Sequence, residues 1–104
     1  MEDFGVMHLY MVEIGLPHYF SQEFMALIPE QRALVNELQS DGVIHSYSLS
    51  LDRSKLWVVM VAESPEEVDD ILESFPIMPY CDSETNELMF HNSISRELPV
   101  ISMN

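Results

Sequence analysis

Two pairs of side chains in this sequence place a histidine two residues before a tyrosine. His45 and Tyr47 lie in the segment 43–51, where side chains alternate with a period of two. In a β-strand both would lie on one face, where they could exchange a proton or bind a small polar ligand. His8 and Tyr10 repeat this spacing near the N-terminus. The pattern indicates either a small cavity lined by aromatic and polar groups or structural pairs that hydrogen bond locally.

A third candidate group is Gln31, in a segment, 22–41, that is rich in helix-favouring residues. The apolar side chains here are spaced for one face of a helix, at Phe24, Leu27, Leu34, Val35 and Leu38. Gln31 lies on that face, so its amide must find partners or cost roughly 1–3 kcal/mol. It is either a pocket residue or a polar group satisfied by carbonyls that Pro29 frees. Its neighbour Glu30 is either a base turned inward or a solvated surface carboxylate.

Composition narrows the classes of partner and cofactor. Eighteen acidic residues against four basic ones give a net charge of −14, so nucleic acids and anionic membranes would be repelled. Cys81 is the single cysteine, which excludes an intrachain disulfide and a cysteine-rich metal site. The histidines show no metal-ligand spacing, and we expect no metal. With no secretion signal or membrane-spanning run, we expect a cytoplasmic protein without nucleic-acid or membrane partners.

Hydrophobic periodicity predicts one α+β domain over residues 1–104, with a core at about 6–91 and a tail at 92–104. Strands are expected at 6–14, 43–51, 56–62 and 81–91, and helices at 22–41 and 64–75. This is the order of the ferredoxin-like βαββαβ unit, in which two helices cover one face of a four-stranded antiparallel sheet. Because the first and third strands are apolar on both faces, we expect a second copy to cover the other face. The predicted assembly is a dimeric α+β barrel.

The connector between the second helix and the last strand is the most distinctive segment of the chain. It reads Ser-Phe-Pro-Ile-Met-Pro-Tyr over 74–80. Proline fixes its own φ and disfavours helix at the preceding residue, so Phe75 is expected to end the helix and Met78 to be extended. Together with Glu-Leu-Gln-Ser-Asp-Gly at 37–42 and His-Asn-Ser-Ile at 91–94, this segment resembles muconolactone isomerase and its relatives.

The resemblance runs from about residue 6 to 94. It implies a dimeric α+β barrel that assembles into larger rings, with C-terminal tails reaching neighbouring subunits. It also implies an active site between the first helix and the sheet, where proton abstraction and return move the double bond of a lactone. That chemistry needs neither a metal nor an organic cofactor.

The residues that would carry this chemistry differ from the family pattern. Counted back without a gap from the shared segment 38–42, the helix carboxylate of the family falls on Gln31, and an amide cannot act as a general base. The basic residues that follow the glycine in the family are absent, because this chain has Ile-His-Ser-Tyr-Ser-Leu at 44–49.

Two main hypotheses follow. Both expect self-association, and a small organic acid or lactone is the candidate ligand. The first is an isomerase with Glu30 or His45 as the catalytic proton shuttle and a substrate pocket lined by Tyr10, Gln31, Tyr47 and Tyr80. The second is a non-catalytic oligomeric module that binds a small molecule or serves as an accessory protein. A haem- or quinone-handling oxygenase on the same barrel is a third possibility, without residue-specific support.

Overall fold

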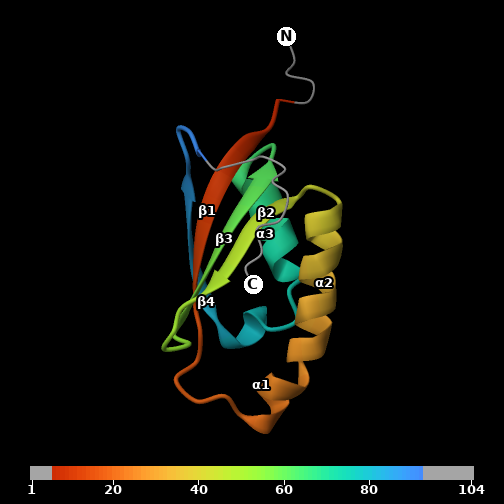
Figure 1. Cartoon of the computed structure of the whole chain (residues 1–104), viewed down its shortest axis with the longest axis vertical. Coiled ribbons are helices and arrows are strands. Elements are labelled where there is room, and N and C mark those ends of the chain that lie inside the picture. Colours follow the sequence, from red (N-terminus) through yellow and green to blue (C-terminus); the bar gives the residue numbers. More distant parts are fainter. Residues whose placement is uncertain (1–5, 93–104) are drawn as a thin grey trace, which may run out of the picture.

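The computed structural model describes residues 6–92 of the chain, and it confirms the α+β class and the ferredoxin-like order (Figure 1). The strands are β1 (His8–Gly15), β2 (Ile44–Leu49), β3 (Lys55–Ala62) and β4 (Asp82–Glu87). The helices are α1 (Gln22–Ala26), α2 (Ile28–Ser40) and α3 (Pro65–Glu73), with a 3-10 helix, η1 (Met78–Tyr80), before β4. All strand pairs are antiparallel, in the order β2-β3-β1-β4. No helix in this part of the chain is long and apolar enough to cross a membrane.

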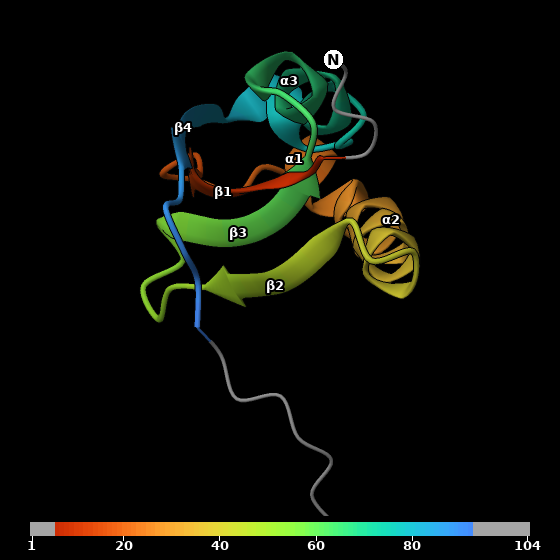
Figure 2. The ribbon, with the colours of Figure 1, turned by 90° about the horizontal axis from the view of Figure 1, so that it is seen from above.

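The helices lie on one face of the sheet, and the core lies between the two layers. Figures 1 and 2 show α2 and α3 on the same side of the strands, with α2 beside β2. Alternate residues of the two central strands point to the helices and are buried: Tyr10, Val12 and Ile14 from β1, and Leu56, Val58, Met60 and Ala62 from β3. This alternation follows from the two-residue period of a strand.

The segment 22–41 forms two helices in place of one. The Ser21 hydroxyl accepts a hydrogen bond from the backbone N–H of Phe24 at 3.1 Å and caps α1. The chain then starts α2 with Pro29 in its first turn, where a missing backbone N–H costs no helical hydrogen bond. Pro29 therefore lies where a new helix starts. Gly42 follows the end of α2 with φ of 79°, a left-handed conformation that favours glycine.

Helix α3 begins at a serine cap followed by proline. The Ser64 hydroxyl accepts from the N–H of Glu67 at 3.2 Å, and Pro65 occupies the first turn. In a capping box the glutamate three residues after the cap accepts from the backbone N–H of the cap residue; here the Glu67 carboxylate accepts instead from the N–H of Glu63 at 2.7 Å. Side chains thus accept from the backbone N–H groups of Glu63 and Glu67 around the start of α3.

Two expectations for the last part of the sheet are wrong. Met78 is not extended, because η1 forms there, with the N–H groups of Met78 and Tyr80 donating to the carbonyls of Phe75 and Ile77. The strand at 81–91 is shorter than expected and consists of the polar residues of β4, not the apolar ones after it. Pairing of backbone groups with β1 defines this edge strand, and its side chains are mostly exposed.

Strand β2 contains an irregularity that changes which side chains share a face. Ile44 pairs with Met60 and Ser46 pairs with the next residue, Val59, so His45 is an extra residue on its strand. An extra residue reverses the alternation beyond it. The prediction that His45 and Tyr47 share a face is therefore wrong: Ile44 and Tyr47 belong to the helix-covered side, and His45 is exposed.

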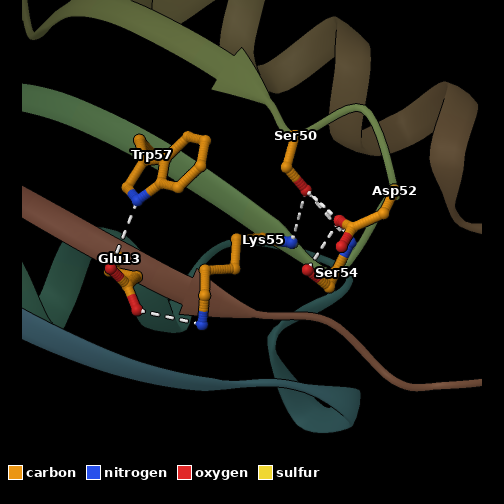
Figure 3. Close-up of polar contacts among 6 residues, drawn as sticks. All are labelled: Glu13, Ser50, Asp52, Ser54, Lys55 and Trp57. Atoms are coloured by element: carbon orange, nitrogen blue, oxygen red, sulfur yellow. Dashed lines mark hydrogen bonds and ion pairs between the residues drawn. The ribbon is translucent and has the colours of Figure 1, made fainter.

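No described helix covers the second face of the sheet. Trp57 lies there with 36% of its surface exposed and donates from Nε1 to the Glu13 carboxylate at 3.2 Å (Figure 3). Lys55 Nζ lies 3.3 Å from the other oxygen of that carboxylate. The hydrogen bond from Trp57, followed by that from Lys55, holds the pKa of Glu13 below its ordinary value. One polar cluster is thus embedded in an otherwise apolar central sheet.

The turn between β2 and β3 is held by a second polar cluster, also drawn in Figure 3. The hydroxyls of Ser50 and Ser54 donate to Asp52 Oδ1 at 2.8 and 2.7 Å. Hydrogen bonds from Ser54 and then Ser50 lower the pKa of Asp52 to about 2. Arg53 has a positive φ of 63°, which is a left-handed backbone conformation. The Asp52 carboxylate therefore stabilises a turn that contains this unfavourable conformation.

Candidate ligand-binding site

A cavity of about 290 Å³ lies between α1, α2 and the helix-covered face of the sheet. Most of its wall is apolar, and its polar groups come from α2 and β2. The lining residues are Leu16, Phe20, Phe24, Ile28, Gln31, Arg32, Val35, Asn36, Gln39, Tyr47, Leu49, Leu56 and Ile77. Arg32, Asn36 and Gln39 are exposed and form a polar rim along α2. An apolar wall with a few polar groups is typical of small-molecule sites.

Gln31 is the buried polar side chain of this site, with 4% of its surface exposed. Its Oε1 accepts a hydrogen bond from the backbone N–H of Ile77 at 3.4 Å. Its Nε2 donates to the Tyr47 hydroxyl oxygen at 3.2 Å. Because the N–H of Ile77 can only donate, the amide oxygen must face it, and the orientation of the amide is fixed. One Nε2 hydrogen remains beyond the bond to Tyr47.

Tyr47 provides the second polar group of the cavity. Its hydroxyl oxygen accepts from Gln31, and no residue among 6–92 accepts the hydroxyl hydrogen. Burial raises the pKa of Tyr47, and the hydrogen bond from Gln31 opposes this shift in part. The phenol therefore stays protonated at neutral pH. Together the two side chains present hydrogen-bond donors at a mostly apolar surface.

Ile77 connects this site to the connector before β4. Its backbone N–H donates to Gln31. Its backbone carbonyl accepts from the N–H of Tyr80 at 3.0 Å and from Cys81 Sγ at 3.3 Å. Burial, followed by the nearby Asp82, raises the pKa of the Cys81 thiol to about 11. This thiol is protonated at neutral pH and acts as a donor that stabilises the turn.

The structure brings together two of the six residues predicted for the site. Gln31 and Tyr47 line the cavity and are bonded to each other. Glu30 is exposed on α2, since consecutive helical residues point about 100° apart, as the roughly 3.6 residues per turn require. His45 is exposed at the irregularity of β2. Neither of these proposed proton shuttles lines the cavity, and their catalytic role stays a prediction.

The two remaining predicted residues, both tyrosines, lie outside the cavity wall. Tyr10 is buried in the core, where burial, followed by the carboxylates of Glu87, Glu66 and Glu67, raises its pKa. Tyr80 is 43% exposed, and its ring lies edge-on to Phe24 with 5.7 Å between centroids. Through Phe24, which does line the cavity, Tyr80 supports the wall from outside.

Sequence reasoning missed the rim of the cavity. Arg32, Asn36 and Gln39 are spaced by four and three residues, so they occupy one stripe of α2 beside the apolar one. That spacing places the three side chains together on one side of the helix, but exposed polar residues of a helix usually face solvent without lining a site. Within residues 6–92, no cluster of three or more His, Cys, Asp or Glu side chains is arranged to hold a metal ion.

The fold and cavity geometry can be set beside known proteins. Residues 7–94 match the sequence model of a family described as muconolactone delta-isomerase, which is most of the chain. No curated protein matches the chain closely enough to count as a relative. The match includes all the described strands and helices, and therefore every residue that lines the cavity.

Replacing Gln31 with leucine should destabilise the fold. The Gln31→Leu variant leaves the buried N–H of Ile77 without its acceptor, so we expect a loss of about 1–3 kcal/mol in the free energy of unfolding. Urea denaturation followed by circular dichroism measures it. The matched control is Glu30→Gln on the same helix, exposed and expected to change stability by less than about 0.5 kcal/mol. Equal losses in the two variants would contradict the assignment of these hydrogen bonds.

Proposed function

The chain belongs to the muconolactone delta-isomerase family, and we propose that it binds a small lactone or unsaturated carboxylic acid in the cavity beside Gln31 and Tyr47. One observation carries the proposal: the Tyr47 hydroxyl accepts from the fixed amide of Gln31 and keeps its own hydrogen for a ligand. A donor held this way at an apolar wall suits a carbonyl oxygen.

The size of the cavity supports a small ligand. Its volume of about 290 Å³ lies at the lower end of the roughly 300–1,000 Å³ typical of small-molecule pockets. A compound with one ring suits this space better than a nucleotide or a large cofactor. The apolar residues at the base of the cavity, including Phe24, Val35 and Leu56, would contact the ring of such a compound.

The chemistry of the lining residues supports binding more strongly than catalysis. Movement of a lactone double bond requires one group to remove a proton and return it. The described residues of the cavity wall include no carboxylate, histidine or thiol. Tyr47 and Gln31 are placed to stabilise negative charge on a carbonyl oxygen. The isomerase reaction needs this stabilisation and, in addition, a group that transfers the proton. We therefore place the non-catalytic small-molecule-binding module first.

The second candidate is an active isomerase, and the same donors favour it. An oxygen held by Tyr47 and Gln31 is where charge develops when a proton leaves the carbon next to a lactone carbonyl. In this candidate Glu30 or His45 provides the proton shuttle, as the sequence predicts. Both side chains lie outside the cavity wall, so the candidate requires one of them to approach the ligand.

We also propose that a second copy of the chain covers the open face of the sheet. Apolar side chains of the central strands lie on that face, with Leu9 next to Val61 and Met11 next to Val59 in the strand register. Trp57 extends this row and is 36% exposed. Val59 is already buried in a single copy, whereas Leu9, Met11 and Val61 are partly exposed. A dimeric α+β barrel would bury these three side chains and Trp57, as the family resemblance also implies.

Loss of the Tyr47 hydroxyl should weaken ligand binding. For Tyr47→Phe we expect the dissociation constant of muconolactone to rise about two- to twelvefold, the effect of one hydrogen bond worth roughly 0.5–1.5 kcal/mol. Isothermal titration calorimetry measures it. The matched control is Tyr19→Phe, whose ring is 79% exposed outside the cavity. The proposal fails if wild-type protein does not bind muconolactone, or if both variants bind it as wild type does.

Restoring a carboxylate should create proton-transfer activity. We expect wild-type protein to leave the double bond of muconolactone in place, and Gln31→Glu to move it, because a buried carboxylate has a raised pKa and can act as a base. Proton NMR in D₂O follows both the double bond and the incorporation of deuterium. Activity in the wild type that is lost in Glu30→Gln or His45→Gln would instead establish the second candidate.

A charge on the open sheet face should separate the proposed dimer. Trp57→Arg places a guanidinium beside the Glu13 carboxylate in the row of apolar side chains, where burying these charges against a second copy costs more than burying the indole, and we expect a monomer where the wild type is a dimer or a larger ring. Size-exclusion chromatography with light scattering gives the mass. Tyr19→Arg, on an exposed loop of the described chain, is the control and should keep the wild-type mass. A monomeric wild type at about 100 µM, a concentration at which specific interfaces are occupied, would contradict the proposal.

A further inference from the structure

Strand β1 repeats the histidine–tyrosine spacing of β2, and here the two side chains do share a face of the sheet. His8 and Tyr10 are alternate residues of β1, which pairs with β3 without an irregularity. His8 pairs with Ala62 at the end of β3, and Tyr10 pairs with Glu87 at the end of β4. Figure 1 shows these strand ends and the start of α3 at the same end of the sheet. Neither His8 nor Tyr10 lines the cavity beside Gln31, so they belong to a second polar region.

Tyr10 is a buried side chain whose polar end has no partner in the described part of the chain. Only 2% of its surface is exposed, yet its hydroxyl forms no hydrogen bond with any residue of 6–92. Every fully enclosed side-chain nitrogen or oxygen atom of these residues has a partner, so the hydroxyl oxygen is one of the atoms that solvent reaches. A buried tyrosine usually pairs its hydroxyl, which can both donate and accept. The core fixes the ring of Tyr10, and its hydroxyl remains open to a ligand.

Three carboxylates surround this hydroxyl. Glu87 is the neighbour of Tyr10 on β4, and Glu66 and Glu67 lie in the first turn of α3. Burial raises the pKa of Tyr10, and the negative charges of Glu87, Glu66 and Glu67 raise it further. Carboxylates that oppose ionisation of a phenol create a negative potential at its oxygen. The same potential favours a cation at this place.

The described part of the chain does not supply enough positive charge to balance these groups. Glu87 Oε2 lies 3.0 Å from His8 Nδ1, and Glu67 accepts from the backbone N–H of Glu63. Glu66 is exposed and has no basic side chain of residues 6–92 within 4.0 Å. Even a protonated His8 would balance only one of the three carboxylates. The arginine and lysine side chains within 6–92 all lie on other elements, at Arg32, Arg53 and Lys55.

We propose that this end of the sheet binds a small organic amine in its protonated form, with the ammonium group donating to the hydroxyl oxygen of Tyr10 and pairing with Glu66 and Glu87. An ammonium group has three donors and no acceptor, so a phenol oxygen and two carboxylates can share it. A neutral phenol oxygen is a good acceptor for N–H. The field of a protein with a net charge of −14 also concentrates cations near its surface. This site is independent of the function proposed for the cavity.

Titration with 1,4-diaminobutane tests the site in the wild-type protein. Spectra that correlate amide protons with nitrogen by NMR report which residues respond. We expect saturable shifts at the amides around Tyr10, Glu66 and Glu87. Butane-1,4-diol has the same chain length without the charges and should not produce them. Magnesium chloride at the same ionic strength should not produce them either, because the proposed ligand is an N–H donor and not a metal ion.

Two variants with a charge-matched control locate the contacts. Tyr10→Phe keeps the ring in the core and removes the hydroxyl, and we expect the dissociation constant of the diamine to rise about two- to twelvefold, the effect of one hydrogen bond. For Glu66→Gln we expect a rise of about two- to fivefold, the effect of an exposed ion pair. Glu73→Gln removes the same charge at the other end of α3 and should stay close to wild type.

The outcomes decide between a site and a general attraction of cations. Shifts spread over the acidic surface, or equal weakening by Glu66→Gln and Glu73→Gln, would overturn the proposal, as would the absence of saturable shifts. Equal shifts with magnesium would also overturn it. Because the Tyr10 hydroxyl has no partner among residues 6–92, Tyr10→Phe should leave thermal unfolding unchanged, which circular dichroism measures. A marked loss of stability in Tyr10→Phe would show that the hydroxyl is already paired and would contradict the premise.

Discussion

The buried amide of Gln31 is the interaction on which the site depends. It links three parts of the chain: its own helix α2, strand β2 through Tyr47, and the connector before β4 through Ile77. A buried amide must be paired, so these parts have to meet in one arrangement. That arrangement leaves a cavity on one side of the amide, and it fixes which of its atoms donate. The polarity of the cavity is thus a consequence of folding and does not require a ligand.

The order of elements could be predicted because each has a local signal. Helix α3 has a capping serine followed by proline, and β3 is a continuous apolar run between polar turns. The burial of Gln31 also follows from sequence, since the apolar residues around it define one helix face. Its partners could not be predicted in this way. Tyr47 and Ile77 are 16 and 46 positions away, so only the tertiary arrangement brings them to the amide.

The errors have physical causes that can be named. A single extra residue in β2 separates His45 from Tyr47, and periodicity alone does not reveal such an irregularity. The last strand was expected to include the apolar residues near position 90, whereas backbone pairing with β1 selects the polar segment before them. Arg32 was overlooked because a charged side chain beside an apolar stripe is the usual pattern of a solvent-facing helix surface.

The fixed amide at the base of the cavity has a genetic consequence. In the genetic code, glutamine and glutamate codons differ only in their first base, so a single nucleotide change exchanges the amide for a carboxylate of the same shape. The backbone N–H of Ile77 would find an acceptor oxygen in either residue. The two states of the site are therefore adjacent in sequence space, and a lineage can pass between a donor-lined pocket and an acid-containing one without rebuilding the wall around it.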